Sequence, residues 1–172
     1  MNPKDYYAKA VEWAVEKKIT SGTSPDTFSP KDTCTRGQIV TFLWKAAGGP
    51  SPGNAHNSFN DVADGKYYYT AVLWAVENGI TAGISENSFG PNMGCTRSQA
   101  VTFLWRYAGK PYAGGQHSFK DVNDAAFYHG AVLWALQNGI TAGTSAVTFE
   151  PEAECTRAQI VTFLYRMMSE GM

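Results

Sequence analysis

The sequence predicts a mainly α-helical protein in which three copies of one helix-loop-helix unit share a single core. The strongest sign is an internal repeat: residues 19–45, 80–106 and 140–166 align without a gap and agree in all three copies at 14 of 27 positions. Positions repeated at intervals of 61 and then 60 residues include Trp13, Trp74 and Trp134, and also Cys34, Cys95 and Cys155. A unit of about 60 residues is marginally stable alone, so we expect one common core.

Three units are expected, at residues 1–48, 49–109 and 110–172, and together they form one module. Stretches rich in Gly, Pro, Asn and Ser separate them, at residues 48–58 and 109–118. A Phe-x-Asp-Val motif follows each linker, at Phe59–Val62 and Phe119–Val122, and the first unit lacks it.

The first helix of each unit is predicted at residues 7–17, 68–77 and 128–137. In the second copy, apolar residues at 68, 71, 72, 75 and 76 follow the period of one buried helix face. Asn78-Gly79 and Asn138-Gly139 then end the helix, since glycine adopts the left-handed conformation that follows a helix C-terminus. The connector continues as Ile-Thr-x-Gly and Phe-x-Pro, and its Ile and Phe are expected to anchor the loop on the core.

The second helix of each unit begins at a capping box, with Thr at the N-cap and Gln three residues later. The three boxes start at Thr35, Thr96 and Thr156. The preceding cysteines occupy the position of a hydrophobic staple, which favours a packing role for them over a three-thiolate metal site. No metal ligands are therefore assigned. We expect these capped helices to form a central cluster, with the first helices outside.

Composition excludes several classes of function. With 14 Lys+Arg against 15 Asp+Glu the formal net charge is −1, so nucleic acid and anionic membranes are poor partners. No apolar run approaches the ~20 residues of a membrane span, and the first five residues are not a signal peptide. The chain is thus expected to be cytosolic, or a mature or excised piece of an exported protein. It contains no Gly-rich phosphate loop, Cys-x-x-Cys or His-x-x-x-His, so neither an enzyme nor a cofactor is expected.

The strongest binding candidates are three arginines at one repeat position, Arg36, Arg97 and Arg157, each directly after the N-cap. The helix dipole disfavours a cation there, which indicates a function. The capping box leaves the next two backbone amides free, so each helix end could hold a carboxylate or phosphate. The alternative is an ion pair between repeats, with Asp61 or Asp121. Replacement of Arg by Gln leaves stability unchanged in the first case and lowers it in the second.

Aromatic residues are the second group of candidates. Trp13, Trp74 and Trp134 either stack on a sugar in a groove or fill the core, and the sequence leaves both readings open. The aromatic residues at 44, 105 and 165 lie on the apolar second helix and are assigned to the core. Tyr67 and its neighbours, with Lys66, are candidates for lining a groove near Asp61.

Taken in order, the motifs Phe-x-Asp-Val, Trp-Ala, Gly-Ile-Thr-x-Gly, Phe-x-Pro and Thr-Arg-x-Gln resemble the S-layer homology repeat, over nearly the whole chain. The resemblance implies a three-repeat helical module with pseudo-threefold symmetry and ligand grooves between repeats. It also implies an extracellular role at the bacterial surface, anchoring proteins to a pyruvylated secondary cell-wall polysaccharide. The alternative is a protein-protein or self-assembly module of a bacterial surface protein.

The same resemblance assigns ligand-binding roles to matching residues of this chain. They are the arginines Arg36, Arg97 and Arg157, the acids Asp61 and Asp121, and the connector glycines Gly22, Gly83 and Gly143. The chain departs from the family signature at two positions: Gln38, Gln99 and Gln159 replace an acidic residue, and cysteine replaces an aliphatic residue before each capping Thr.

Overall fold

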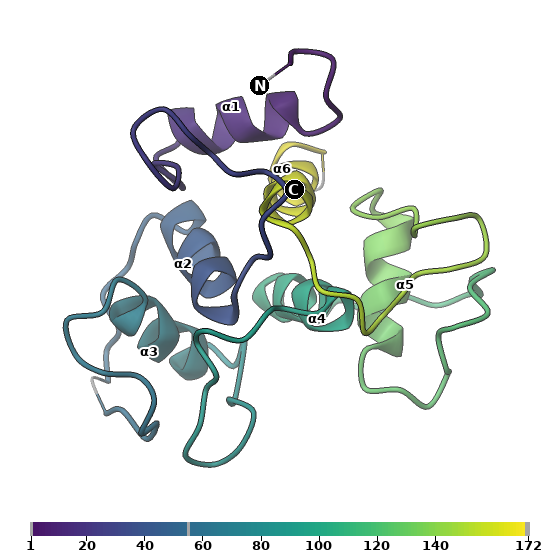
Figure 1. Ribbon diagram of the computed structural model, residues 1–172. Coiled ribbons are helices and arrows are strands. Elements are labelled where there is room, and N and C mark those ends of the chain that lie inside the picture. Colours follow the sequence, from purple (N-terminus) through teal and green to yellow (C-terminus); the bar gives the residue numbers. More distant parts are fainter. Residues whose placement is uncertain (1, 55, 171–172) are drawn as a thin grey trace.

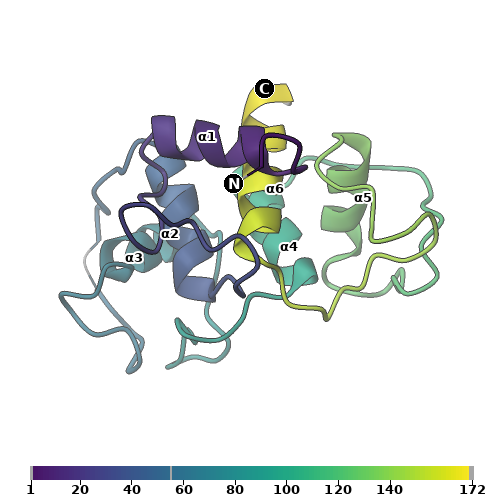
Figure 2. The same ribbon diagram turned by 45° about the horizontal axis from the view of Figure 1, so that its top comes forward.

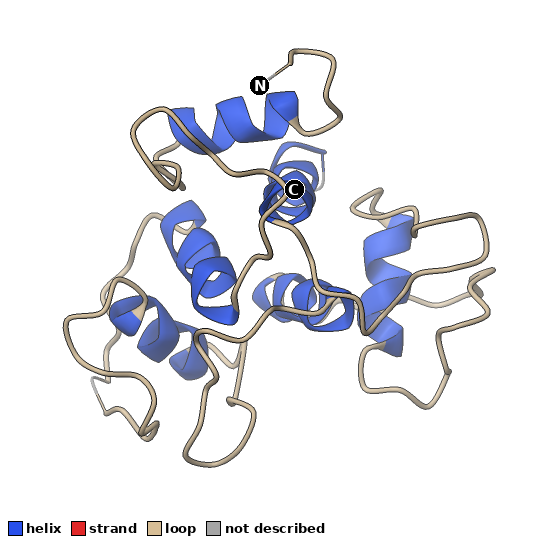
Figure 3. Cartoon of the chain, viewed as in Figure 1, coloured by secondary structure: helices blue, strands red, loops and turns tan. Residues whose placement is uncertain are grey.

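The computed structural model describes residues 2–54 and 56–170 and confirms the helical fold class. Ala55, in the first predicted linker, lies outside the described residues. The helices are α1 (Ala8–Glu16), α2 (Arg36–Ala46), α3 (Tyr69–Glu77), α4 (Arg97–Tyr107), α5 (His129–Gln137) and α6 (Arg157–Glu170). Within the described ranges the chain forms helices and long loops, with no strand (Figure 3). None of these helices is both long and apolar enough to cross a membrane.

Helices α2, α4 and α6 pack against one another at the centre, and α1, α3 and α5 lie outside them (Figures 1 and 2). Outer helix α3 packs on α2, α5 packs on α4, and α1 packs on α6. Each packed pair therefore combines helices from two different sequence units. The third pair joins the first helix of the chain to the last, so the arrangement closes into a ring.

All three predicted capping boxes are present. At α2 the Gln38 amide donates to the Thr35 hydroxyl at 3.3 Å, and the Thr35 amide donates to the Gln38 side chain at 3.2 Å. The same reciprocal pair forms at the N-termini of α4 and α6. Each box satisfies two backbone donors that the helix start leaves without partners, and this sets where the central helices begin.

The three cysteines meet where the central helices start. The Cys34 amide donates to the Cys155 carbonyl at 2.8 Å, Cys155 donates to Cys95 at 2.8 Å, and Cys95 donates to Cys34 at 2.9 Å. This closed ring of backbone hydrogen bonds ties the three units together. All three side chains are fully buried within the core, as the staple interpretation requires.

Native-state thiol chemistry is the first prediction. Burial raises the pKa of Cys34 and Cys155 to about 12 and that of Cys95 well above its usual value. Because the thiolate is the reactive form, we expect no thiol of the folded protein to react with Ellman's reagent at pH 8, and three to react in denaturant. The raised pKa also means that the stability from neutral thiols is present below about pH 9 and is lost at higher pH. Rapid labelling of the folded chain would contradict the buried ring.

The backbone conformation of the connector explains why glycine occupies positions 22, 83 and 143. Gly22, Gly83 and Gly143 have φ values of +87°, +88° and +83°, a region that side chains with a Cβ rarely adopt. A Cβ on Gly143 would lie 2.5 Å from both the Thr148 carbonyl oxygen and the ring of Phe119. Glycine therefore lets each connector turn tightly on itself and, in the second and third units, lets it pack against the Phe-x-Asp-Val segment.

Candidate functional site

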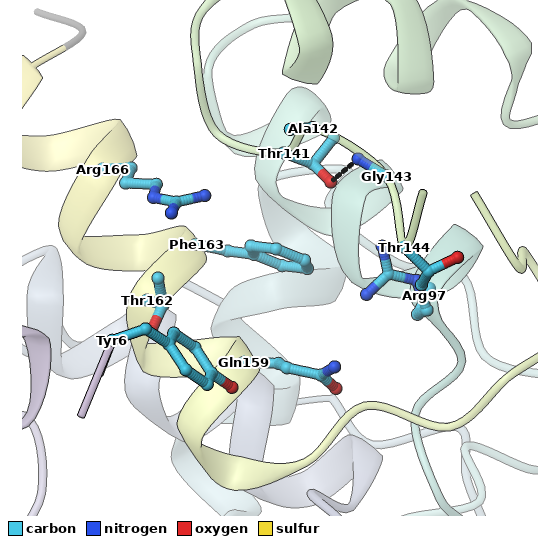
Figure 4. A pocket seen from close by; sticks show the side chains of 10 residues that line it. All are labelled: Tyr6, Arg97, Thr141, Ala142, Gly143, Thr144, Gln159, Thr162, Phe163 and Arg166. Carbon is cyan, nitrogen blue, oxygen red and sulfur yellow. Dashed lines mark hydrogen bonds between the residues drawn. The ribbon is translucent and has the colours of Figure 1, made fainter. Parts of the chain in front are cut away.

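Three equivalent pockets lie where one central helix meets the connector and central helix of the next unit. Their volumes are about 390, 420 and 290 Å³, and we name them after the arginine that each contains: the Arg97, Arg157 and Arg36 pockets. The Arg97 pocket, shown in Figure 4, is lined by Tyr6, Thr141–Thr144, Gln159, Thr162, Phe163 and Arg166 as well. Corresponding positions line the other two, with Gly22, Gln38 and Phe42 in the Arg157 pocket and Gly83, Gln99 and Phe103 in the Arg36 pocket.

Each pocket carries two cationic side chains. Arg97 is accompanied by Arg166, Arg157 by Lys45, and Arg36 by Arg106. Among the described residues that line these three pockets, none is Asp or Glu. In a chain whose net charge is only −1, this separation of charge makes three local positive sites that favour an anion.

The arginine of each pocket is held in the same buried position. Arg97 is 3% exposed, and its Nε donates to the Phe149 carbonyl at 2.7 Å. Its guanidinium carbon lies 4.8 Å from the ring centre of Phe149 and 5.7 Å from that of Phe163. Equivalent contacts hold Arg36 and Arg157 against the connector and central helix of the next unit. Each arginine therefore bridges two units.

One nitrogen of each guanidinium is left without a partner. The Nη2 atoms of Arg36, Arg97 and Arg157 are buried and make no hydrogen bond. Burial also lowers the pKa of all three guanidinium groups, which reflects the cost of holding charge away from water. A buried charged donor without an acceptor is unusual in a folded protein, and here it adds uncompensated positive charge beside each pocket.

The prediction that free backbone amides at the helix N-termini bind an anion is wrong, because these amides already have partners. The first two amides of α2, on Arg36 and Gly37, donate to the carbonyls of Met93 and Pro91 at 2.9 Å each. Connector carbonyls accept in the same way from the first two amides of α4 and α6. These amides are therefore spent on joining neighbouring units, and a pocket ligand can be held only by side chains and connector atoms.

The predicted acids hold connectors rather than arginines. Asp61 accepts hydrogen bonds from the Ser88 hydroxyl and the Phe89 and Gly90 amides at 2.6–2.9 Å. Asp121 accepts likewise from the Phe149 and Glu150 amides. Neither carboxylate forms an ion pair with an arginine of the described chain, so the alternative of an Arg–Asp pair between repeats is not found there. Instead, the acid and the arginine both hydrogen-bond the backbone of the same connector residue. The acid accepts from the amide of Phe89 or Phe149, and the arginine donates to its carbonyl.

Acid sensitivity of the fold is the second prediction. Burial acts to raise the pKa of Asp61 and Asp121. Hydrogen bonds from the connector amides to both carboxylates, and from Ser88 to Asp61, outweigh it and lower the pKa of both. A depressed folded-state pKa contributes stability that is present above about pH 4 and is lost as the pH falls through the folded value. In urea titrations between pH 6 and pH 3 we expect Asp61→Asn with Asp121→Asn to flatten this loss. If the pH dependence of the unfolding free energy were the same in this variant, the hydrogen bonds to the two carboxylates would not contribute to stability.

The three tryptophans do not line these pockets. Trp74 and Trp134 are only 6% and 7% exposed and belong to the core. Trp13 packs on the core from α1, with its ring 5.6 Å from that of Tyr165 on α6. Of the two readings of these residues, the structure favours core packing, because the outer helices turn the tryptophans toward the central helices.

The structure brings into the pockets two sets of residues that the sequence analysis did not assign to them. Lys45, Arg106 and Arg166 share one repeat position near the ends of the central helices, and each is the second cation of a pocket. Tyr6, Tyr67 and Phe127 line the same pockets and are 64%, 60% and 66% exposed. Tyr67 thus lines the Arg157 pocket and not a groove at Asp61. Their common spacing of 61 and 60 residues is a signal that was present in the sequence.

Comparison with known proteins places these features in context. The family model of the S-layer homology domain matches residues 1–40, 58–101 and 118–161. The chain is 32% identical over 118 residues to the surface-layer 125 kDa protein of Lysinibacillus sphaericus, covering 67% of the chain and 10% of that protein. It is 28% identical over 166 residues to an endoglucanase of Bacillus sp. (90% and 17%) and 23% identical over 152 residues to the cellulosome-anchoring protein of Acetivibrio thermocellus (84% and 34%). The chain thus spans between a tenth and a third of the length of these relatives.

Proposed function

The chain belongs to the S-layer homology domain family, and from this we propose that it is a non-catalytic module that anchors a bacterial protein at the cell surface. The ligand that we propose is an anionic secondary cell-wall polysaccharide carrying pyruvate groups, bound in the Arg97, Arg157 and Arg36 pockets. In this function the side chains of the pockets bind the polysaccharide non-covalently, without a chemical step.

The observation that carries the proposal is the charge pattern of the pockets. Each has two cations, no acidic residue among its described lining residues, and one buried guanidinium nitrogen without a partner. A pyruvate ketal presents a carboxylate on a sugar, and a guanidinium forms strong charge-assisted hydrogen bonds with a carboxylate. The pocket arginine and the second cation would share that carboxylate.

Exposed aromatic rings support a saccharide as the carrier of this charge. Tyr6, Tyr67 and Phe127 each line one pocket and are more than half exposed. An aromatic ring of this kind can stack on the apolar face of a sugar. These rings would then take the stacking role that the sequence alone leaves open for Trp13, Trp74 and Trp134.

The relatives support the cell-surface part of the proposal. Two of them are named as a surface-layer protein and a cellulosome-anchoring protein, and the third is an endoglucanase. The chain covers 17% of the endoglucanase, and the pockets contain no pair of carboxylates of the kind that glycoside hydrolysis uses. An anchoring role shared by proteins of different activity is consistent with these three names.

The test is binding to a purified pyruvylated cell-wall polysaccharide and to the same polymer after its pyruvate has been removed by mild acid. We expect binding to the first polymer only. The triple variant Lys45→Gln, Arg106→Gln, Arg166→Gln removes one cation from each pocket and should weaken binding at least tenfold, the scale of one charge-assisted hydrogen bond. The matched control is Lys9→Gln, Lys31→Gln, Lys120→Gln, which removes the same charge from exposed positions outside the pockets.

Three outcomes would contradict the proposal. Equal binding to both polymers would overturn the role of pyruvate, and equal weakening by both triple variants would overturn the role of the pockets. Concentration-dependent self-association without glycan binding would instead favour the alternative of an assembly module.

A further inference from the structure

A group of potential metal ligands lies outside the three pockets, at the start of the third unit's outer helix. One ligand atom from each of His117, Asp124 and His129 lies within 4.8 Å of the other two. The Nε2 atom of His129 is 3.4 Å from Oδ1 of Asp124, and the rings of His117 and His129 are 5.4 Å apart between centres. His117 precedes the Phe-x-Asp-Val motif, Asp124 follows it, and His129 opens α5.

His117 has no partner for either of its ring nitrogens. Both Nδ1 and Nε2 are buried and make no hydrogen bond, although buried polar atoms in native proteins nearly always have one. The contact between His129 and Asp124 accounts for two members of the group and leaves His117 unexplained. A nitrogen lone pair held without a donor is the form in which histidine binds a metal ion.

The second unit provides an internal comparison, because it contains the same segment without the two histidines. Asn57 occupies the position of His117 there, donating to the Val62 carbonyl at 2.7 Å and accepting from the Phe59 amide at 3.0 Å. Tyr69 takes the place of His129, while Asp64 matches Asp124. Where the second unit has a satisfied amide, the third unit therefore has an imidazole with no partner and a second imidazole beside it.

We propose that His117, Asp124 and His129 form a Zn²⁺ site that ties the Phe-x-Asp-Val segment of the third unit to the first turn of α5. Two imidazole nitrogens and one carboxylate oxygen are ligands that zinc accepts, with water at the fourth position. With zinc–ligand bonds of about 2.0–2.1 Å, tetrahedral ligands lie about 3.4 Å apart, which the His129–Asp124 separation already matches. Hard cations such as Ca²⁺ and Mg²⁺ prefer oxygen ligands only and should not compete.

The ion has a way in from solvent. The Asp124 side chain is 90% exposed and forms the outer side of the group, while both histidines are only partly exposed. His117 stacks on Phe119, and the Phe119 ring packs where a Cβ on Gly143 would lie. Bound zinc would thus brace the segment against which the connector of the Arg97 pocket turns. The site itself is independent of the glycan proposal.

The experiment is titration of the metal-free protein with Zn²⁺, followed by calorimetry and by competition with a chromophoric chelator. We expect one ion per chain and a higher melting temperature with zinc, because the ion binds the folded state. His117→Asn and His129→Tyr introduce the residues of the second unit, so both variants should fold and both should bind zinc at least 100-fold more weakly. Even outer-shell partners of a metal ion are worth 10–100-fold in affinity. His56→Asn, at an exposed histidine in the first linker, is the matched control and should bind normally.

Cobalt distinguishes this site from the three thiols, since a Co²⁺ complex with thiolate ligands shows charge-transfer absorption and one with two imidazoles and a carboxylate does not. Absence of stoichiometric zinc binding would overturn the proposal. Unchanged affinity in His117→Asn, equal loss in His56→Asn, or a thiolate spectrum would each do the same.

Discussion

Removal of residues 1–17 is expected to unfold the whole protein. These residues include α1, which packs on α6, the last helix of the chain. Val11 and Ala14 are 4% and 0% exposed in that contact region, and Trp13 packs against Tyr165. Loss of this apolar contact should cost on the order of 5 kcal/mol, which is the whole stability of many small domains. Urea denaturation followed by circular dichroism would measure it.

A circular permutant is the control, because it moves the chain ends away from α1 and keeps α1 in the protein. Joining residue 170 to residue 2 through a flexible Gly/Ser linker and opening the chain in the 49–58 linker keeps every helix pair. The permutant should retain nearly full stability and cooperative unfolding. A stable, cooperative deletion variant, or an unfolded permutant, would show that the α1–α6 pair does not close the core.

Arg97→Gln is expected to destabilise the protein by about 2–4 kcal/mol, the scale measured when one partner of a buried charged contact is removed. The change removes the hydrogen bond to the Phe149 carbonyl and the contacts with two phenylalanine rings. It therefore loosens the junction between the second and third units. This reverses the sequence-based expectation for a ligand-binding arginine, in which stability is unchanged.

Arg166→Gln is the matched control, because Arg166 lines the same pocket from a less buried position. Its Nη1 donates to the Ile140 carbonyl at 3.1 Å, and its replacement should cost about 1 kcal/mol or less. Thermal unfolding of both variants gives the comparison. Equal melting temperatures would argue that Arg97 does not bridge the units and acts on ligand alone.

Local features of this fold were predictable because a few neighbouring residues determine them. Thr96 and Gln99 form a capping box within one turn, and Gly79 ends α3 through its own backbone conformation, with φ of +65°. The repeat spacing also predicted one shared core. These features need no knowledge of which segments pack together.

The remaining features depend on contacts between distant segments. The first amides of α2 are occupied by carbonyls of residues 91 and 93, which no pattern around Arg36 reveals. Trp74 was left open between groove and core because its burial depends on how α3 is placed on α2. Arg106 satisfies a helix-dipole rule in the last turn of α4 and also lines a pocket, so the simpler local explanation hid its second position.

Closure of the ring by α1 and α6 also determines when the protein can fold. The hydrogen bond from Arg157 to the Phe28 carbonyl spans 129 residues, and such separations give a high contact order and slow folding. On the ribosome or during export, α1 emerges early and must wait for α6 before its apolar face is covered. The face of α1 that packs on α6 therefore stays uncovered, and accessible to chaperones, until α6 has emerged. Such a delay is compatible with passage across a membrane in an unfolded state, followed by folding on the far side.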